Sequence, residues 1–197
     1  MADPDHVAEL DEFDVMMVRL YRGGILLSAA GLLLMTVSQF RSVEALGFLG
    51  GLDPLLEGRV PLVVLCFGVA LIVVNLHLYD KKIRWMIRMS GWMGALLLLG
   101  SSHDLGTATP LVEMAGIGFL FVCLSAIALK EQMCFQLTGL RLVPLLLVLA
   151  LVPMLAKANI AAGALLAAVG VLYMSLAIAK LRMPLHYDIG DKGRYDA

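Results

Sequence analysis

The apolar and polar positions of the chain form six long apolar runs separated by short polar segments. A helix needs about 20 mostly apolar residues to cross a bilayer core about 30 Å thick. The runs at 24–40, 60–79 and 158–179 approach this length without a Lys, Arg, Asp or Glu. The other three runs reach it once flanking residues are added. We therefore expect membrane-spanning helices at residues 22–40, 60–79, 84–102, 110–129, 141–156 and 158–179.

The third and fifth of these predicted spans depart most from an ideal apolar helix. In the third span, Arg84 and Arg88 would have to extend toward the lipid headgroups. In the fifth, Pro144 and Pro153 favour kinks. If one of the two spans were re-entrant, the termini would lie on opposite sides of the membrane.

Basic residues are divided unevenly between the two sides that six spans define. Of the 15 Lys and Arg residues, Arg41, Arg59 and Lys157 lie on one side, and the other twelve lie on the side of both termini. Cytoplasmic loops carry an excess of Lys and Arg. We therefore expect the amino and carboxyl termini to be cytoplasmic. Helical spans also favour the bacterial cytoplasmic (inner) membrane, because outer-membrane proteins are β-barrels.

Composition supports a polytopic, all-α membrane protein. Hydrophobic residues make up 60% of the chain and charged residues 16%, and the mean hydropathy is +0.89. Ordinary soluble domains are about 45–50% apolar and about 25% charged. The apolar content excludes a disordered chain, and the net charge of −1 argues against a basic nucleic-acid-binding protein.

The domain organisation that we expect follows from these spans. Residues 1–18 form an acidic cytoplasmic segment, which lacks the basic start of a cleaved signal peptide. Residues 19–180 form a six-helix transmembrane bundle, and residues 181–197 form a cytoplasmic tail. Glycines at several positions of the bundle should let helices approach closely: Gly91, Gly94, Gly116, Gly118, Gly163 and Gly170.

Glu113 is the clearest ionisable residue within a predicted span, and such residues are the first candidates for function. It follows Pro110 in the first turns of the fourth span, where it could bind a proton or a cation. The alternative is structural, because a carboxylate near a helix N-terminus is stabilised by the helix dipole. We favour this alternative, since the sequence shows no partner for Glu113 near the membrane rim.

Two polar junctions emerge on the expected cytoplasmic side, one after the second span and one after the fourth. They supply carboxylates, cations, a histidine and a thiol: Asn75, His77, Tyr79, Asp80, Lys81, Lys130, Glu131 and Cys134. We expect His77, Asp80, Lys130 and Glu131 to lie within contact distance of one another. Such a cluster could lock the spans together, form a docking surface or serve as a small active site. We favour the structural role, in which the cluster locks the spans together, because basic residues are common on this side whatever the function of the protein.

The sequence predicts no catalytic residue, cofactor or metal site. No phosphate-binding lysine loop, HExxH motif or GxSxG motif is present. The three cysteines form no CxxC pair, and His77 has no second histidine in a span with which to hold a haem. These absences lower the probability of an enzyme without excluding one.

The two junctions also carry a resemblance. The segments VNLHLYDKKIRWMIRMSGWMGALLLL and IALKEQMCFQLTGLRLVPLLLVLALVPML, with Tyr21-Arg22 at the start of the first span, resemble a bacterial and cyanobacterial integral membrane family. That family is known only as a domain of unknown function, number twenty-three hundred and one in its series. The resemblance extends from about residue 18 to residue 180. It implies a membrane protein and supplies no activity, substrate or catalytic residue.

Three functions remain compatible with the sequence. The favoured one is a non-catalytic accessory, assembly or scaffold protein of the membrane, which fits the short loops and the lack of motifs. The second is a small transporter or channel, proton-coupled through Glu113. The third is a membrane enzyme that uses the cytoplasmic cluster. The expected partners are the lipid bilayer and either a membrane protein or further copies of the chain, with no nucleic acid.

Overall fold

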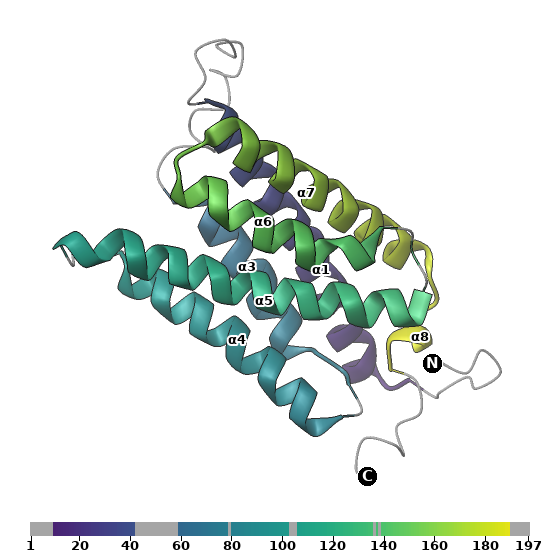
Figure 1. Ribbon diagram of the computed structural model, residues 1–197. Coiled ribbons are helices and arrows are strands. Elements are labelled where there is room, and N and C mark those ends of the chain that lie inside the picture. The colour runs from purple at the N-terminus through teal and green to yellow at the C-terminus, as the bar shows by residue number, and fades with distance from the viewer. Residues whose placement is uncertain are drawn as a thin grey trace.

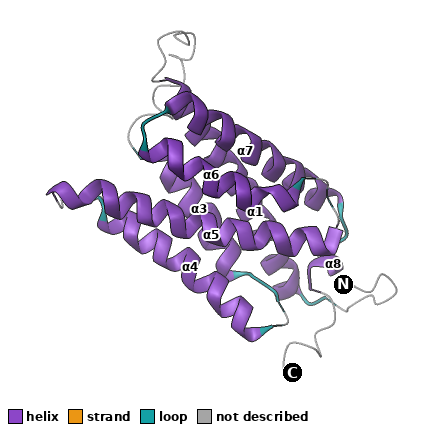
Figure 2. Cartoon of the chain, in the orientation of Figure 1, coloured by secondary structure: helices purple, strands orange, loops and turns teal. Residues whose placement is uncertain are grey.

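A computed structural model describes residues 10–41, 59–78, 80–102, 106–135, 137 and 139–189. These residues form α-helices and two short 3-10 helices, and within them no strand occurs (Figures 1 and 2). The helices are α1 (Glu12–Arg41), α3 (Val60–Val74), α4 (Lys81–Gly100), α5 (Thr109–Phe135), α6 (Val143–Leu155), α7 (Asn159–Arg182) and α8 (His186–Ile189). The 3-10 helices are η2 (Gly106–Ala108) and η3 (Leu140–Leu142). The prediction of an all-α fold is confirmed.

The six longer helices pack as a bundle in which sequential neighbours run in opposite directions (Figure 1). Gly24 of α1 lies against Ile72 of α3, whereas Gly31, farther along α1, lies against Leu65. The two helices are therefore antiparallel. α8 follows α7 and lies beside the beginning of α1, at the end of the bundle where α5 and α7 finish (Figure 1).

Local sequence signals explain where several helices begin. The backbone N–H of Asp14 donates to Asp11 Oδ1 over 2.7 Å, and the N–H of Asp11 donates to Asp14 Oδ2 over 3.1 Å. This reciprocal pair satisfies two N–H groups at the start of α1, as a capping box does. At α4 the Asp80 carboxylate accepts from the backbone N–H groups of Lys82 and Ile83. α3 and α6 each have a proline in the first turn, where its missing N–H is not needed.

Glycine permits the close contact between α1 and α3. A Cβ atom on Gly68 would lie 2.6 Å from the backbone nitrogen of Ser28, a distance that real Cβ atoms do not adopt. The pairing of α4 with α5 uses the same device, because Gly94 and Gly116 lie against each other's helices. The expected interhelical role of these two glycines is confirmed, but Gly118 faces open space and is not in such a contact.

The lengths of the helices bear on the predicted membrane crossings. Within the described residues, three segments are long and apolar enough to cross a membrane, which are Glu12–Arg41, Gly106–Cys134 and Asn159–Arg182. Val60–Val74 and Leu140–Leu155 are shorter apolar helices. α1 begins ten residues before the predicted start at residue 22, because the capped acidic turn continues directly into the apolar run. Residues 1–9 of the acidic segment and residues 190–197 of the tail lie outside the described residues.

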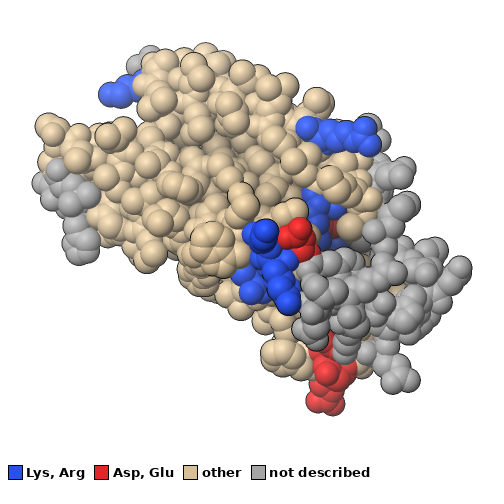
Figure 3. Space-filling model, turned by 60° about the horizontal axis from the view of Figure 1, so that its bottom comes forward, with Lys and Arg blue, Asp and Glu red and all other residues tan. Residues whose placement is uncertain are grey.

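The core of the bundle contains large apolar residues from all six longer helices, and Tyr173 is fully buried among them. Its hydroxyl donates to the backbone carbonyl of Leu124. Large apolar side chains are also exposed on all six longer helices, and residues other than Lys, Arg, Asp and Glu cover most of the face in Figure 3. This combination of an apolar interior and an apolar exterior suits a protein that is surrounded by lipid.

Candidate functional site

The most concentrated chemistry of the described residues is a buried ionic network centred on Glu131, in the last two turns of α5. Glu131 Oε1 accepts from the Tyr21 hydroxyl over 2.6 Å and from Lys130 Nζ over 3.0 Å. Lys180 Nζ lies 2.6 Å from Oε2. The side chains of Glu131 and Lys180 are 0% and 1% exposed. α1, α5 and α7 thus meet at one carboxylate.

Arg22 extends the network toward the carboxyl terminus. Its Nε donates to Asp188 Oδ2 over 2.7 Å, and Nη2 lies 2.6 Å from the same oxygen. Nη1 donates to the Met183 carbonyl over 2.7 Å, and Nη2 to the Pro184 carbonyl over 2.9 Å. The other Asp188 oxygen pairs with Lys180. Arg22 therefore fixes the segment that follows α7 onto α1.

The ring of Tyr21 adds to the stabilisation of the two ammonium groups. Lys130 Nζ lies 4.6 Å and Lys180 Nζ 5.8 Å from the ring centroid, within the range of cation–π interactions. Lys130 Nζ also lies 3.2 Å from the Tyr21 hydroxyl. Lys130 is the most exposed of the charged members of the network, with 13% of its side chain accessible. The network thus reaches the surface at Lys130.

Burial makes the pairing of these groups essential. The five charged members are three cations and two carboxylates: Arg22, Lys130, Lys180, Glu131 and Asp188. An ion taken out of water is stable only when opposite charge and hydrogen bonds replace its hydration. Removal of one partner of a buried ion pair typically destabilises a protein by about 3–5 kcal/mol. The geometry therefore suits a lock that holds four helices in one arrangement.

The structure brings together Lys130 and Glu131 of the residues that the sequence singled out. Asp80 is exposed and accepts hydrogen bonds from the first turn of its own helix, α4. Asp80 therefore caps the start of α4 and is not a member of the network. Lys81, in the same turn, and Cys134, in the last turn of α5, are both exposed. Tyr79 lies outside the described residues.

Asn75 and His77 close the carboxyl-terminal end of α3. Asn75 Nδ2 donates to the Leu71 carbonyl over 2.8 Å, and His77 Nδ1 lies 2.9 Å from the Asn75 carbonyl oxygen. These two contacts satisfy polar groups of the chain where α3 ends.

Glu113 lies in the second turn of α5, where the sequence placed it, and its side chain is one-third exposed. The sequence offered no partner, but Arg59 Nη2 lies 3.5 Å from its Oε2. Arg59 also donates to Ser101 Oγ over 3.0 Å and to the Ser101 carbonyl over 2.6 Å. The expectation of an isolated carboxylate was wrong, because Arg59 reaches it from the start of α3.

Sequence reasoning missed four members of the network: Tyr21, Arg22, Lys180 and Asp188. Arg22 and Lys180 appeared to be ordinary interfacial basic residues. One signal was available, because the run from Glu12 to Arg41 contains no proline and its capped start places Arg22 within a helix. The position of Asp188 depends on the fold of the tail, for which the sequence has no comparable signal.

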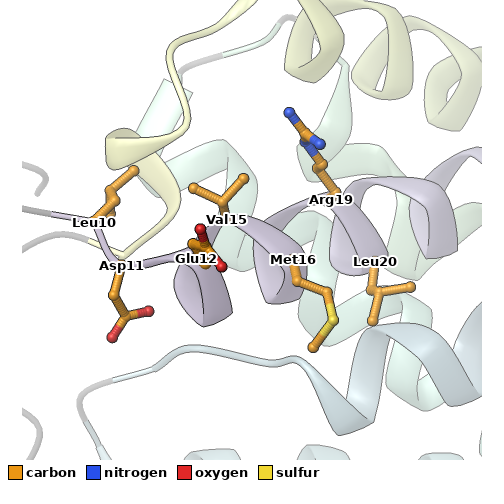
Figure 4. Close-up of a pocket in the computed structure, with 7 residues that line it drawn as sticks. All are labelled: Leu10, Asp11, Glu12, Val15, Met16, Arg19 and Leu20. Atoms are coloured by element: carbon orange, nitrogen blue, oxygen red, sulfur yellow. The ribbon is translucent and has the colours of Figure 1, made fainter.

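The surface has two further features, a region of charged side chains and a hollow at the start of α1. Charged side chains gather toward one end of the face in Figure 3, where Lys and Arg lie beside Asp and Glu. An open hollow lies beside the start of α1 and has seven lining residues (Figure 4): Leu10, Asp11, Glu12, Val15, Met16, Arg19 and Leu20. Because all seven come from the start of one helix and the two residues before it, the hollow lacks the converging groups of a ligand site. Within the described residues, no three His, Cys, Asp or Glu side chains are grouped to bind a metal.

Comparisons with known proteins point to the same class. The family model described as "Uncharacterized integral membrane protein (DUF2301)" matches residues 69–196. An uncharacterized protein of Haemophilus influenzae is 28% identical over 195 residues, which cover 99% of this chain and 99% of that protein. No solved structure matches the chain.

Proposed function

The chain belongs to the DUF2301 family of uncharacterized integral membrane proteins, and from that premise we propose that it is a non-catalytic accessory, assembly or scaffold protein of the membrane. Its role would be to bind and stabilise another membrane protein. The observation that carries this proposal is the composition of the outer face of α4. The buried network supports it, because charges that bind one another inside the chain favour a rigid scaffold.

The outer face of α4 carries a concentration of exposed methionine and tryptophan side chains: Trp85, Met86, Met89, Trp92 and Met93. The large exposed side chains of α6 are only leucine and valine: Leu145, Val148, Leu149, Val152 and Leu155. Both faces are apolar enough for lipid. Methionine and aromatic residues are, however, enriched where proteins contact proteins, since they adapt to a partner and bury large areas.

The position of α4 fits such a contact. α4 packs against α5 and α3 and lies at the margin of the bundle, so its outer side is open to a neighbour in the membrane (Figure 1). Trp85 lies beside the basic first turns of α4 and suits the headgroup level. Trp92 lies two turns deeper, where lipid alone does not favour an indole. We propose that a helix of another membrane protein packs on this face.

The test is purification of the tagged protein from native membranes in mild detergent, with mass spectrometry of the proteins that accompany it. Trp92→Leu/Met93→Leu keeps α4 apolar and removes two of the five methionine and tryptophan side chains on its outer face, including the deeper tryptophan. Val148→Leu/Leu149→Val on α6 is the matched control. We expect a membrane protein at fixed stoichiometry with the wild type and the control, and its loss with the α4 variant. Retention by the α4 variant, or a chain that always purifies alone, would contradict the proposal.

A small transporter is the second candidate, and Pro153 within α6 is the observation that favours it, because interrupted helices line many transport sites. The route through Glu113 is weakened by its pairing with Arg59 and by its exposure. Proteoliposome flux that Glu113→Gln abolishes would favour transport over the accessory role. Flux that persists in this variant would exclude Glu113 as the coupling group.

We also propose six crossings of the bacterial inner membrane, with both termini cytoplasmic. The alternating direction of the helices supports this topology (Figure 1). So does the distribution of Lys and Arg among the described residues, of which only Arg41, Arg59 and Lys157 lie at the opposite end of the bundle. α3 and α6 would need to cross with flanking residues or within a locally thinned bilayer.

A further inference from the structure

We infer that Arg22 and Lys180 form a binding site for a phosphate-type oxyanion, and that the chain's own Asp188 occupies this site as a displaceable plug. The inference is independent of the proposed accessory role. It rests on how Asp188 is held, on the segment that delivers it and on the charges that remain when it leaves.

Asp188 is held as recognition sites hold a small oxyanion. The guanidinium of Arg22 presents its Nε–Nη2 edge, with both nitrogens within 2.7 Å of Oδ2. The ammonium of Lys180 pairs with Oδ1 from the other side. Both arginine nitrogens thus converge on one oxygen, and the planar set of guanidinium donors suits the oxygens of carboxylate and phosphate groups. The side chains of Arg22 and Lys180 are 5% and 1% exposed, so the two cations form a built site rather than a surface patch.

Asp188 belongs to a short segment that follows α7. α7 ends at Arg182, and residues 183–189 return over the end of the bundle to α1. Each hydrogen-bond acceptor of Arg22 belongs to this segment, namely the Met183 carbonyl, the Pro184 carbonyl and Asp188. If the segment leaves, Arg22 therefore loses all three acceptors in one step. A four-residue helix also contributes little helical stability of its own.

The charge balance indicates what must replace the segment. With Asp188 in place, the network has three cations and two carboxylates. Without it, Glu131 is the carboxylate that remains beside Arg22, Lys130 and Lys180 among the described ion pairs. Buried cations without counter-charge are unfavourable, so an open site would take up an anion from outside. Lys130, the most accessible cation, marks the approach.

The ligand that this chemistry selects is a phosphate group. Two sources are available at the end of a membrane bundle, the headgroup of an anionic phospholipid and free phosphate. Free phosphate can bind to the protein in detergent, whereas a phospholipid headgroup requires that lipid to be present. An experiment can therefore distinguish the two sources.

The first test uses the full chain with Asp188→Asn, which removes the charge of the plug and keeps its shape. In a zwitterionic detergent at constant ionic strength, inorganic phosphate at about a hundred times its Kd should raise Tm by about 5–10 °C. The wild type should show a smaller rise. Arg22→Gln/Asp188→Asn is the matched control and should show no rise. If free phosphate has no effect, nanodiscs with phosphatidylglycerol rather than phosphatidylcholine should stabilise Asp188→Asn, which would identify the lipid as the source.

The second test keeps the network intact and therefore does not depend on the folding of Asp188→Asn. Hydrogen exchange of residues 183–189 in the wild type should become faster when phosphate or phosphatidylglycerol competes with Asp188. Ile189→Ala removes a buried apolar anchor of the same segment without changing a charge, so it should lower the anion concentration needed. Exchange that neither anion changes, with no anion-dependent rise in Tm, would overturn the inference and leave Asp188 as a permanent lock.

Discussion

Glu131 and Lys180 are 49 positions apart in the chain, yet their side chains meet with Oε2 and Nζ 2.6 Å apart and with almost no access to water. The contact joins α5 to α7 at the end of the bundle where α1 begins. This ion pair lies where α1, α5 and α7 converge. The remaining groups of the network surround it.

The first prediction concerns the loss of one cation from this network. Lys180→Met should lower the free energy of unfolding by about 3–5 kcal/mol, because it removes the buried ammonium that pairs with one oxygen of Glu131 and one of Asp188. Thermal or denaturant unfolding in detergent measures the change. Arg182→Met, two residues along on an exposed position, is the control and should change stability by less than about 0.5 kcal/mol. Equal effects of the two substitutions would contradict the account.

The second prediction concerns the contact between α1 and α3. Gly68→Ala should destabilise the bundle by about 1–3 kcal/mol, because the new Cβ would meet the backbone of Ser28 at 2.6 Å and force the helices apart. Gly118→Ala has no atom within 4 Å of the new Cβ. The same unfolding measurement should show this control to be neutral or slightly stabilising, since alanine favours a helix more than glycine does. A destabilised Gly118→Ala with an unaffected Gly68→Ala would be the opposite of what the packing predicts.

The third prediction concerns topology. Cys134 is exposed at the end of α5, and Ala156 is exposed at the turn between α6 and α7. In intact cells, a membrane-impermeant maleimide should label Ala156→Cys in a Cys134→Ser background, and should label the wild-type Cys134 only after the inner membrane is opened. Reversed labelling would place the termini outside, and labelling of both sites from outside would contradict an odd number of crossings between them.

Much of the fold could be predicted from the pattern of apolar runs. Each of the six runs contains most of one longer helix. Pro144 was expected to favour a kink but lies in the first turn of α6, where a proline fits without one. The start of α1 was predicted too late, because hydropathy alone ignores the capped turn at Asp11–Asp14. Hydropathy finds the apolar part of a helix, whereas capping groups determine where the helix begins.

The candidate site was predicted only in part, and sequence separation explains why. Lys130 and Glu131 were recognised because they stand together after a long apolar run. Tyr21 lies 110 positions from Glu131, and Arg22 lies 166 positions from Asp188. These pairs depend on how each helix is rotated and on the return of the tail to α1. A single sequence contains no periodic signal for either.

The central claim is that the charges of the network bind one another in the interior of the bundle. A double-mutant cycle between Glu131 and Lys180 tests it most directly, with Glu131→Gln, Lys180→Met and the double variant compared in one unfolding assay. The account predicts a coupling energy of about 1–3 kcal/mol, with the double variant less destabilised than the sum of the single variants. A coupling energy near zero would contradict it, because two groups that do not meet in the folded protein should act independently.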